Sequence, residues 1–184
     1  KSLKEFKERQ ESGETMIGIS TGIEELDEIT EGLREGQMWV LGAMTSGGKS
    51  AFMMNVVDSV LRSGKKASIY SLEMNQNAII ARLLGIRMNI SDTDIVKLVA
   101  DKEKLWEHIK ALKSEGLKIY GTELENLDSM MMSIVRDVSR GQTDAVFIDY
   151  IQLMGVSGNM KSNEKLEHIA RQLRLLASRT GVPI

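Results

Sequence analysis

The chain has 184 residues, enough for one domain with a sizeable core, and its 42% apolar and 27% charged residues are typical of a soluble α/β protein. The absence of cysteine excludes disulfides and cysteine-bound zinc, and the two histidines, His108 and His168, lie among charged neighbours, which argues against a histidine metal site. The net charge of −2 gives no global attraction to nucleic acid, so a DNA contact has to come from a local patch or an oligomeric surface.

Residues 1–11 predict a short charged helix in which only Leu3 and Phe6 are apolar, on one face. Such a helix is unstable alone and needs a neighbouring surface; the alternative is a disordered terminus. Gly13 marks the break into the rest of the chain. No apolar run has the length of a membrane span or the form of a signal peptide, so we expect a cytoplasmic protein with no membrane partner.

The next segment leads from a short helix into an apolar strand. A helix is predicted over Ile23–Ile29, with Thr21 as its N-cap. Gly32 and Gly36 then mark the turn into a strand at Met38–Gly42, which runs into a glycine-rich loop ending Gly-Lys-Ser. A helix follows over Ala51–Leu61, where apolar residues recur at helical spacing.

This order of strand, glycine-rich loop and helix predicts a phosphate site. Gly47 and Gly48 allow backbone N–H groups to turn toward an anion, and the helix N-terminus adds partial positive charge. Lys49 can reach the β- and γ-phosphates of ATP, and the Ser50 hydroxyl can ligate Mg²⁺. Ala43 stands where the strict motif has glycine, and the alternative is an ordinary glycine turn with an unrelated lysine. The predicted nucleotide-binding residues are Ala43, Met44, Thr45, Ser46, Gly47, Gly48, Lys49, Ser50 and Ala51.

Two later strands each deliver a carboxylate at their carboxyl end. The apolar run from Ala145 closes on Asp149, which we expect to hold Mg²⁺ together with Ser50. The run from Ala67 to Leu72 is followed by Glu73, a candidate general base for the attacking water. The alternatives are that Asp149 merely begins a loop and that Glu73 is an acid at a helix N-terminus.

The remaining elements alternate between helices and strands, which predicts a mostly parallel sheet with helices on both faces. They are helices near 77–87, 92–99, 102–114, 127–138 and 164–178, and a strand at 117–120. Trp106 lies beside the apolar stripe of its helix, and no function follows from its position. The polar segment Gly155–Ser162 is either a nucleic-acid loop with Lys161 as a phosphate contact or a plain connection.

Four segments resemble the RecA-like motor domain of DnaB-type replicative DNA helicases, with similarity from about Thr15 to Ile184. They are Gly18–Asp27, Ala43–Ser50, Ser71–Met74 and Val146–Met154. The resemblance implies a RecA-like P-loop NTPase fold of the α/β class over 15–184 and a linker helix over 1–14 that packs on an adjacent subunit. In that family the Glu of the Ser71–Met74 segment is the catalytic base, which agrees with the role expected for Glu73.

The resemblance further implies a hexameric ring that hydrolyses ATP with Mg²⁺ and moves 5′–3′ along single-stranded DNA. It also implies primase and a helicase loader as partners. A RecA-like recombinase or clock-type ATPase would share the fold and the loop, but the run Ile148–Met154 favours the helicase. A non-hydrolysing nucleotide-binding scaffold would be expected to lose Glu73 or Asp149, and both are present.

The last residues, Val182–Ile184, stand where the next strand should begin. In RecA-like proteins this strand lies between the P-loop strand and the strand that carries the magnesium-binding acid, here Asp149. In the family, a polar sensor, a DNA-gripping loop and a basic finger that reaches the neighbouring site all follow it. We therefore expect an incomplete motor domain with feeble ATPase activity and no unwinding on its own.

Overall fold

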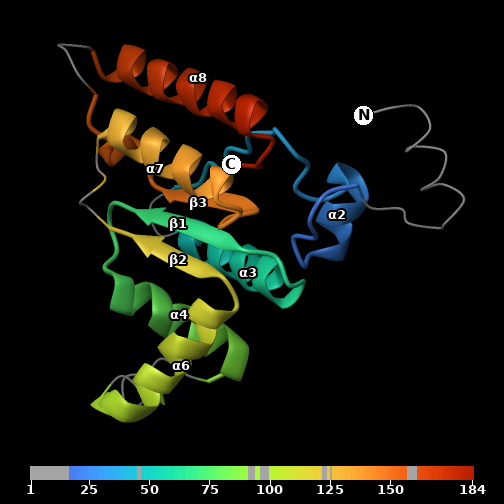
Figure 1. Cartoon of the computed structure of the whole chain (residues 1–184), viewed down its shortest axis with the longest axis vertical. Helices are drawn as coiled ribbons and strands as arrows, with labels where there is room; N and C mark the ends of the chain where they lie inside the picture. Colours follow the sequence, from blue (N-terminus) through green and yellow to red (C-terminus); the bar gives the residue numbers. More distant parts are fainter. Residues whose placement is uncertain are drawn as a thin grey trace, which may run out of the picture.

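A computed structural model describes residues 17–44, 47–90, 94–95, 100–121, 124, 126–156 and 161–184 (Figure 1). The predicted linker helix, most of the helix near 92–99 and four residues of the loop Gly155–Ser162 lie outside these ranges. In chain order the elements are α2 (Glu24–Thr30), α3 (Lys49–Arg62), β1 (Ala67–Ser71), α4 (Gln76–Met88), α6 (Lys102–Ser114), β2 (Leu117–Tyr120), α7 (Leu127–Ser139), β3 (Ala145–Asp149), a 3₁₀ turn (Ile151–Leu153) and α8 (Ser162–Thr180).

The three strands form a parallel sheet in the order β2–β1–β3. Ala67 of β1 aligns with Leu117 of β2 on one side and with Ala145 of β3 on the other. Every residue of β1 is buried, as expected for a central strand that is covered on both faces. The prediction of a parallel sheet is therefore confirmed.

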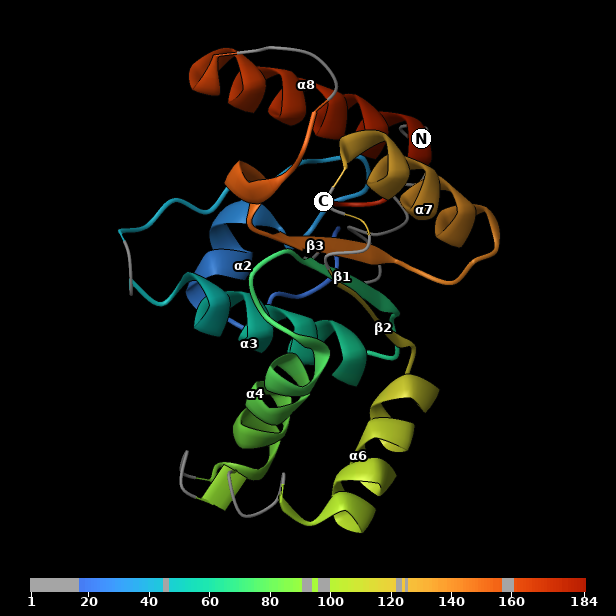
Figure 2. The ribbon, with the colours of Figure 1, turned by 90° about the vertical axis from the view of Figure 1, so that its left-hand side faces the viewer.

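Helices cover both faces of this sheet, so the protein has three layers (Figure 2). Helices α3, α4 and α6 lie on one face, and α7 and α8 lie on the other. Because successive side chains of a strand point to opposite faces, Ile69 packs in the core on the α3 side and Tyr70 in the core beneath α7 and α8. Both side chains are fully buried, so β1 joins the two cores.

The strand predicted at Met38–Gly42 is not formed as a regular strand; residues 37–44 are extended and lack assigned secondary structure. The physical reason is partial pairing. The Trp39 N–H donates to the Ile184 carbonyl (2.8 Å), and the Ile184 N–H donates to the Gln37 carbonyl (3.0 Å), but this pairing ends at the last residue of the chain.

The same C-terminal segment also contacts β3, where the Val146 N–H donates to the Pro183 carbonyl (3.0 Å). Residues Pro183 and Ile184 therefore lie between the segment leading into the glycine-rich loop and the strand that carries Asp149. The strand order expected from the sequence is confirmed at this point.

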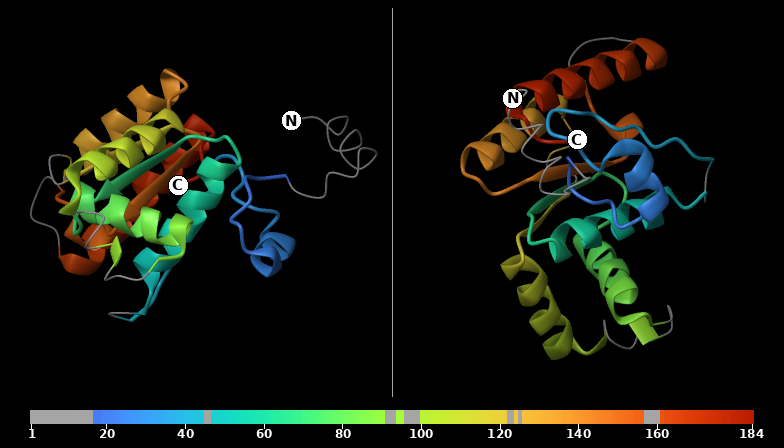
Figure 3. Two further views of the ribbon diagram at one scale, coloured as in Figure 1. Left: turned by 90° about the horizontal axis from the view of Figure 1, so that it is seen from below. Right: turned by 90° about the vertical axis from the view of Figure 1, so that its right-hand side faces the viewer.

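Helix α2 stands to one side of the sheet (Figure 3, left). Its N-cap is Ile23, not Thr21, so the predicted cap is wrong. Instead, Thr21 and Ser20 form a turn whose hydroxyl groups donate to the Asp27 carboxylate at 2.7 and 2.6 Å. Thr21 is committed to this turn, which precedes the helix, and its hydroxyl accepts only a weak 3.3 Å contact from the Ile23 N–H.

Candidate nucleotide site

The two glycines before Lys49 are required for different reasons. Gly48 is the N-cap of α3 and has φ 82°, a left-handed conformation that costs a residue with a Cβ about 1–2 kcal/mol. A Cβ on Gly47 would lie 2.9 Å from the Met44 carbonyl oxygen, the atom that accepts the Gly47 N–H at the same distance. The loop is therefore a tight turn that brings the chain to the start of α3. The predicted ligands Thr45 and Ser46 lie outside the described residues.

Helix α3 begins at Lys49, and no side chain caps its N-terminus. The first turn carries no acidic residue, so its partial positive charge is not compensated by a nearby carboxylate of the helix. These features suit a phosphate group, which would supply the missing acceptors. The Lys49 ammonium turns back toward the loop, with Nζ 3.4 Å from the Ala43 carbonyl oxygen.

Ser50 and Asp149 meet at this N-terminus although 99 positions separate them in the chain. The Ser50 hydroxyl donates to the Asp149 carboxylate at 2.7 Å. Asp149 ends β3 and is only 5% exposed, while its backbone carbonyl accepts the Leu72 N–H at 2.8 Å. The alternative in which Asp149 merely begins a loop is therefore wrong.

Glu73 follows β1 at the same edge of the sheet, because Ser71, the last residue of β1, aligns with Asp149. The Ser71 hydroxyl accepts the Met74 N–H at 3.0 Å and closes the bend that carries Glu73. Helix α4 begins only at Gln76 and is capped by Asn75, whose side chain accepts the Ala78 N–H at 2.9 Å. Glu73 is exposed and lies before that cap, so it is not a first-turn acid of α4.

Tyr150 is a neighbour of Lys49 that the sequence reasoning did not select. The Lys49 Nζ lies 5.8 Å from the centroid of the Tyr150 ring, within the range of a cation–π contact. The signal available in the sequence was its position directly after Asp149 at the carboxyl end of a buried strand. Tyr150 and the Ala43 carbonyl together surround the ammonium group.

The segment before the loop is tied to α3 through Asp27. This carboxylate accepts the Thr21 N–H at 2.9 Å in addition to the two hydroxyl groups, and the Ser20 carbonyl accepts the Ser59 hydroxyl of α3 at 3.1 Å. Burial raises the pKa of Asp27, but the hydrogen bonds from Ser20 and Thr21 outweigh it and hold the pKa below its usual value. Asp27 is therefore a structural acid that anchors the turn.

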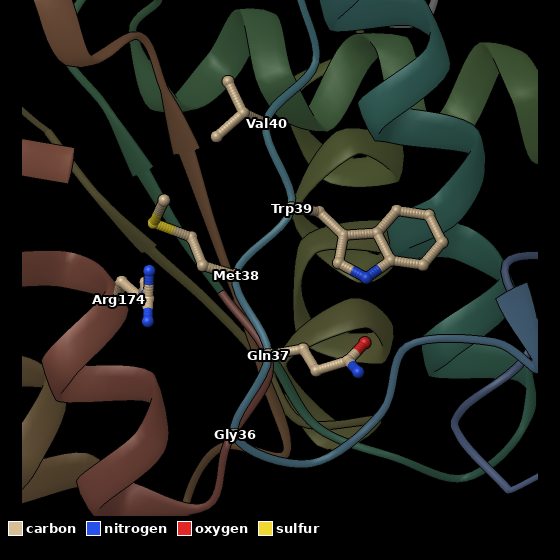
Figure 4. Close-up of a pocket in the computed structure, with 6 residues that line it drawn as sticks. All are labelled: Gly36, Gln37, Met38, Trp39, Val40 and Arg174. Carbon is tan, nitrogen blue, oxygen red and sulfur yellow. The ribbon is translucent and has the colours of Figure 1, made fainter. Parts of the chain in front are cut away.

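A cavity of about 440 Å³ lies next to the extended segment before the loop (Figure 4). It is lined by Gly36, Gln37, Met38, Trp39, Val40 and Arg174. Figure 4 shows the side chains of Met38 and Val40 on one side of the backbone and those of Gln37 and Trp39 on the other, the alternation of a strand. None of the predicted phosphate ligands lines it, so this cavity is separate from the nucleotide site.

The donors at the nucleotide site fit a magnesium ion that is bound jointly with phosphates. Mg²⁺ is usually held by one or two protein oxygens together with substrate phosphates and waters, and Ser50 and Asp149 provide such a hydroxyl–carboxylate pair. Within the described ranges there is no group of three or more His, Asp or Glu side chains that could hold a metal ion without a substrate.

The fold and this site define the class, a RecA-like α/β domain with a P-loop. The sequence model for "DnaB-like helicase C terminal domain" matches residues 18–184. The chain belongs to this family. It is 32% identical over 186 aligned residues to the replicative DNA helicase DnaB of Helicobacter pylori (strain J99), and 31% identical over 175 to that of Geobacillus stearothermophilus. These alignments cover 96% and 92% of this chain but only 38% of each helicase.

Solved structures agree with the family assignment. One of them, an isolated ATPase domain, superposes with a TM-score of 0.83 at 25% identity, covering 98% of this chain and 67% of that one. A DnaB-like replicative helicase whose interactions with primase were studied superposes with a TM-score of 0.77 over 98% of this chain and 45% of that one. At 24% identity, this second likeness concerns the fold alone.

Proposed function

We propose that this domain is the ATP-hydrolysing motor of a replicative DNA helicase. The observation that carries the proposal is the 2.7 Å contact between the Ser50 hydroxyl and the Asp149 carboxylate at the uncapped N-terminus of α3. It brings a P-loop hydroxyl and a strand-end acid together where a phosphate-bound magnesium ion would sit. Membership of the DnaB-like helicase family supports the same function.

Each residue of the site has a role that follows from its position. The N–H groups at the start of α3 would bind phosphate oxygens, and Lys49 would leave the Ala43 carbonyl to pair with the β- and γ-phosphates. Ser50 and Asp149 would hold Mg²⁺, which when bound neutralises charge on the transferred phosphoryl group. Glu73, exposed at the same edge, would orient the attacking water and accept its proton.

The larger assembly is part of the proposal. By its resemblance to DnaB-type helicases, we infer a hexameric ring that uses ATP to move 5′–3′ along single-stranded DNA and to unwind duplexes, with primase and a helicase loader as partners. The recombinase and clock-type alternatives lose support because the family match is to DnaB-like helicases. A non-hydrolysing scaffold loses support because Glu73 and Asp149 both stand at the reactive edge. None of the described helices combines the length and apolar character needed to cross a bilayer.

The decisive experiment compares Glu73→Gln with wild type in MgATP binding and in phosphate release. We expect binding to be retained and hydrolysis to fall about 10²–10⁴-fold, the scale of a lost general base. Glu167→Gln, an exposed glutamate on α8, is the matched control and should hydrolyse ATP normally. Because hydrolysis by this chain alone is expected to be weak, phosphate release is followed under single-turnover conditions at high protein concentration. Undiminished hydrolysis by Glu73→Gln would place the base elsewhere.

A further inference from the structure

Helix α6 exposes a tryptophan that belongs to neither core. Trp106 is 54% exposed, whereas Ile109 and Leu112 of the same helix are buried at 7% and 2%. The helix is therefore anchored through its other face, against the sheet side that ends in β2. A large aromatic side chain left in water is characteristic of a binding surface.

Two lysines flank this indole. The ammonium groups of Lys110 and Lys113 lie 6.0 and 5.9 Å from the centroid of the Trp106 ring, and both lysines are exposed. They follow Trp106 by four and seven residues, so helical geometry keeps all three on one face of α6. The result is an aromatic plane with two positive charges beside it, on a chain whose net charge is −2.

We propose that Trp106, Lys110 and Lys113 form an accessory contact for single-stranded nucleic acid. An exposed aromatic ring stacks on any base, and adjacent lysines pair with the phosphates on either side, which is the combination used for binding without sequence preference. An acidic peptide would use the charges but has no ring that must stack on the indole. The exposed ring together with the two charges therefore favours nucleic acid.

The acids of α6 define the direction of the contact. Glu107 follows Trp106 directly and is turned about 100° away around the helix, since an α-helix has 3.6 residues per turn. Glu103 lies one turn before Trp106 and would repel a phosphate there. The strand should therefore extend from Trp106 toward Lys110 and Lys113, the C-terminal half of α6.

This contact goes beyond the proposed motor site and is independent of it. The nucleotide site is built by α3 and by the carboxyl ends of β1 and β3, whereas α6 and α8 lie at opposite ends of the molecule, with the sheet between them (Figure 1). Binding through Trp106 needs no ATP. Its failure would leave the ATPase proposal intact, and the reverse also holds.

The test uses the intrinsic fluorescence of Trp106, since the chain has only one other tryptophan, Trp39. In a Trp39→Phe background, an oligothymidylate added without nucleotide should quench the Trp106 emission to saturation. A parallel oligouridylate titration distinguishes DNA from RNA, and quenching by either supports the proposal. Unchanged emission at concentrations that saturate binding would overturn it, and quenching by polyglutamate with competition against the oligonucleotide would assign the surface to an acidic protein instead.

A second measurement does not depend on the Trp39 substitution. By anisotropy of a labelled oligothymidylate, Trp106→Ala should weaken binding about 5- to 150-fold, from about 1–3 kcal/mol per stacked base, and Trp106→Phe should weaken it less. Lys110→Gln with Lys113→Gln should reduce the slope of log K against log salt by about 1.4, that is about 0.7 for each lost phosphate contact. The control pair Lys65→Gln with Arg140→Gln removes the same charge from exposed sites elsewhere. Equal affinity of Trp106→Ala and wild type, or an equal effect of both lysine and control pairs, would refute the contact.

Discussion

The pairing of Ser50 with Asp149 predicts that the two residues act on MgATP as one unit. Their 2.7 Å contact joins a hydroxyl to a nearly buried carboxylate, and hydrogen bonds to charged groups contribute about 1.5–3 kcal/mol. If both side chains hold the same magnesium ion, Ser50→Ala or Asp149→Asn alone removes most of the magnesium-dependent affinity. We expect each variant to weaken binding of MgATP about 10- to 150-fold, the equivalent of that energy.

The assay is a titration of a fluorescent ATP analogue with Mg²⁺ and again with excess chelator, for wild type, both single variants and the double variant. The double variant should lose much less than the sum of the two single losses, with a coupling energy of at least about 1 kcal/mol. Affinity without Mg²⁺ should change little. Asp128→Asn, an exposed aspartate in the first turn of α7, serves as the control. Additive losses, or equal losses with and without Mg²⁺, would refute the shared-ion interpretation.

Three further predictions concern single positions. Lys49→Ala should abolish measurable MgATP binding, because Lys49 is the P-loop cation expected at the β- and γ-phosphates, whereas Lys65→Ala should leave the titration unchanged. Gly48→Ala should lower the free energy of unfolding by about 1–2 kcal/mol in denaturant melts, since its φ is 82°, while Gly42→Ala, whose Cβ would meet nothing within 4 Å, should be neutral; equal midpoints for both would refute the strain argument. Because hydrogen bonds hold the pKa of Asp27 below its usual value, its contribution to stability is present above pH 4 or so and is lost as the pH falls through the lower, folded-state pKa. Asp27→Asn should therefore flatten the acid limb of a plot of unfolding free energy against pH, and an unchanged limb would contradict that assignment.

The sequence predicted the elements that carry strong periodicity or buried runs. The strand ending at Asp149 and the helix over 102–114 have the bounds expected from their patterns, and α8 begins only two residues earlier than predicted. The contact of Ser50 with Asp149 was also predictable, since parallel strands bring their carboxyl ends to one edge.

Other features depend on tertiary contacts that no local pattern contains. Thr21 has the chemistry of an N-cap, but the Asp27 carboxylate recruits it into a turn before the helix. The apolar residues of 38–42 fit a strand, yet regular pairing requires neighbours on both sides along their full length. The position of Trp106 outside both cores likewise follows from which face of α6 the sheet covers.

The backbone around Ile184 leads to the last prediction. The amide groups of Trp39 and Val146 donate to Ile184 and Pro183 from opposite sides. Alternate residues of an extended chain direct their N–H groups to the same side, so Leu41 and Ile148 point theirs into the same space, two residues further on. In the described sheet β3 is an edge strand, and Val40 and Leu41 are 69% and 48% exposed.

We therefore expect hydrogen exchange measured by NMR to be at least about tenfold faster at Leu41 and Ile148 than at Trp39 and Val146, the equivalent of about 1.4 kcal/mol. In a longer chain that continues as a strand after Ile184, exchange at Leu41 and Ile148 should slow, while exchange at Ala67 in the central strand should change little. An unpaired amide in this half-buried position costs about 1–3 kcal/mol, so the added strand should also raise the free energy of unfolding. If Ile148 already exchanges as slowly as Val146, another group satisfies its N–H, and the space beside β3 is not reserved for a strand.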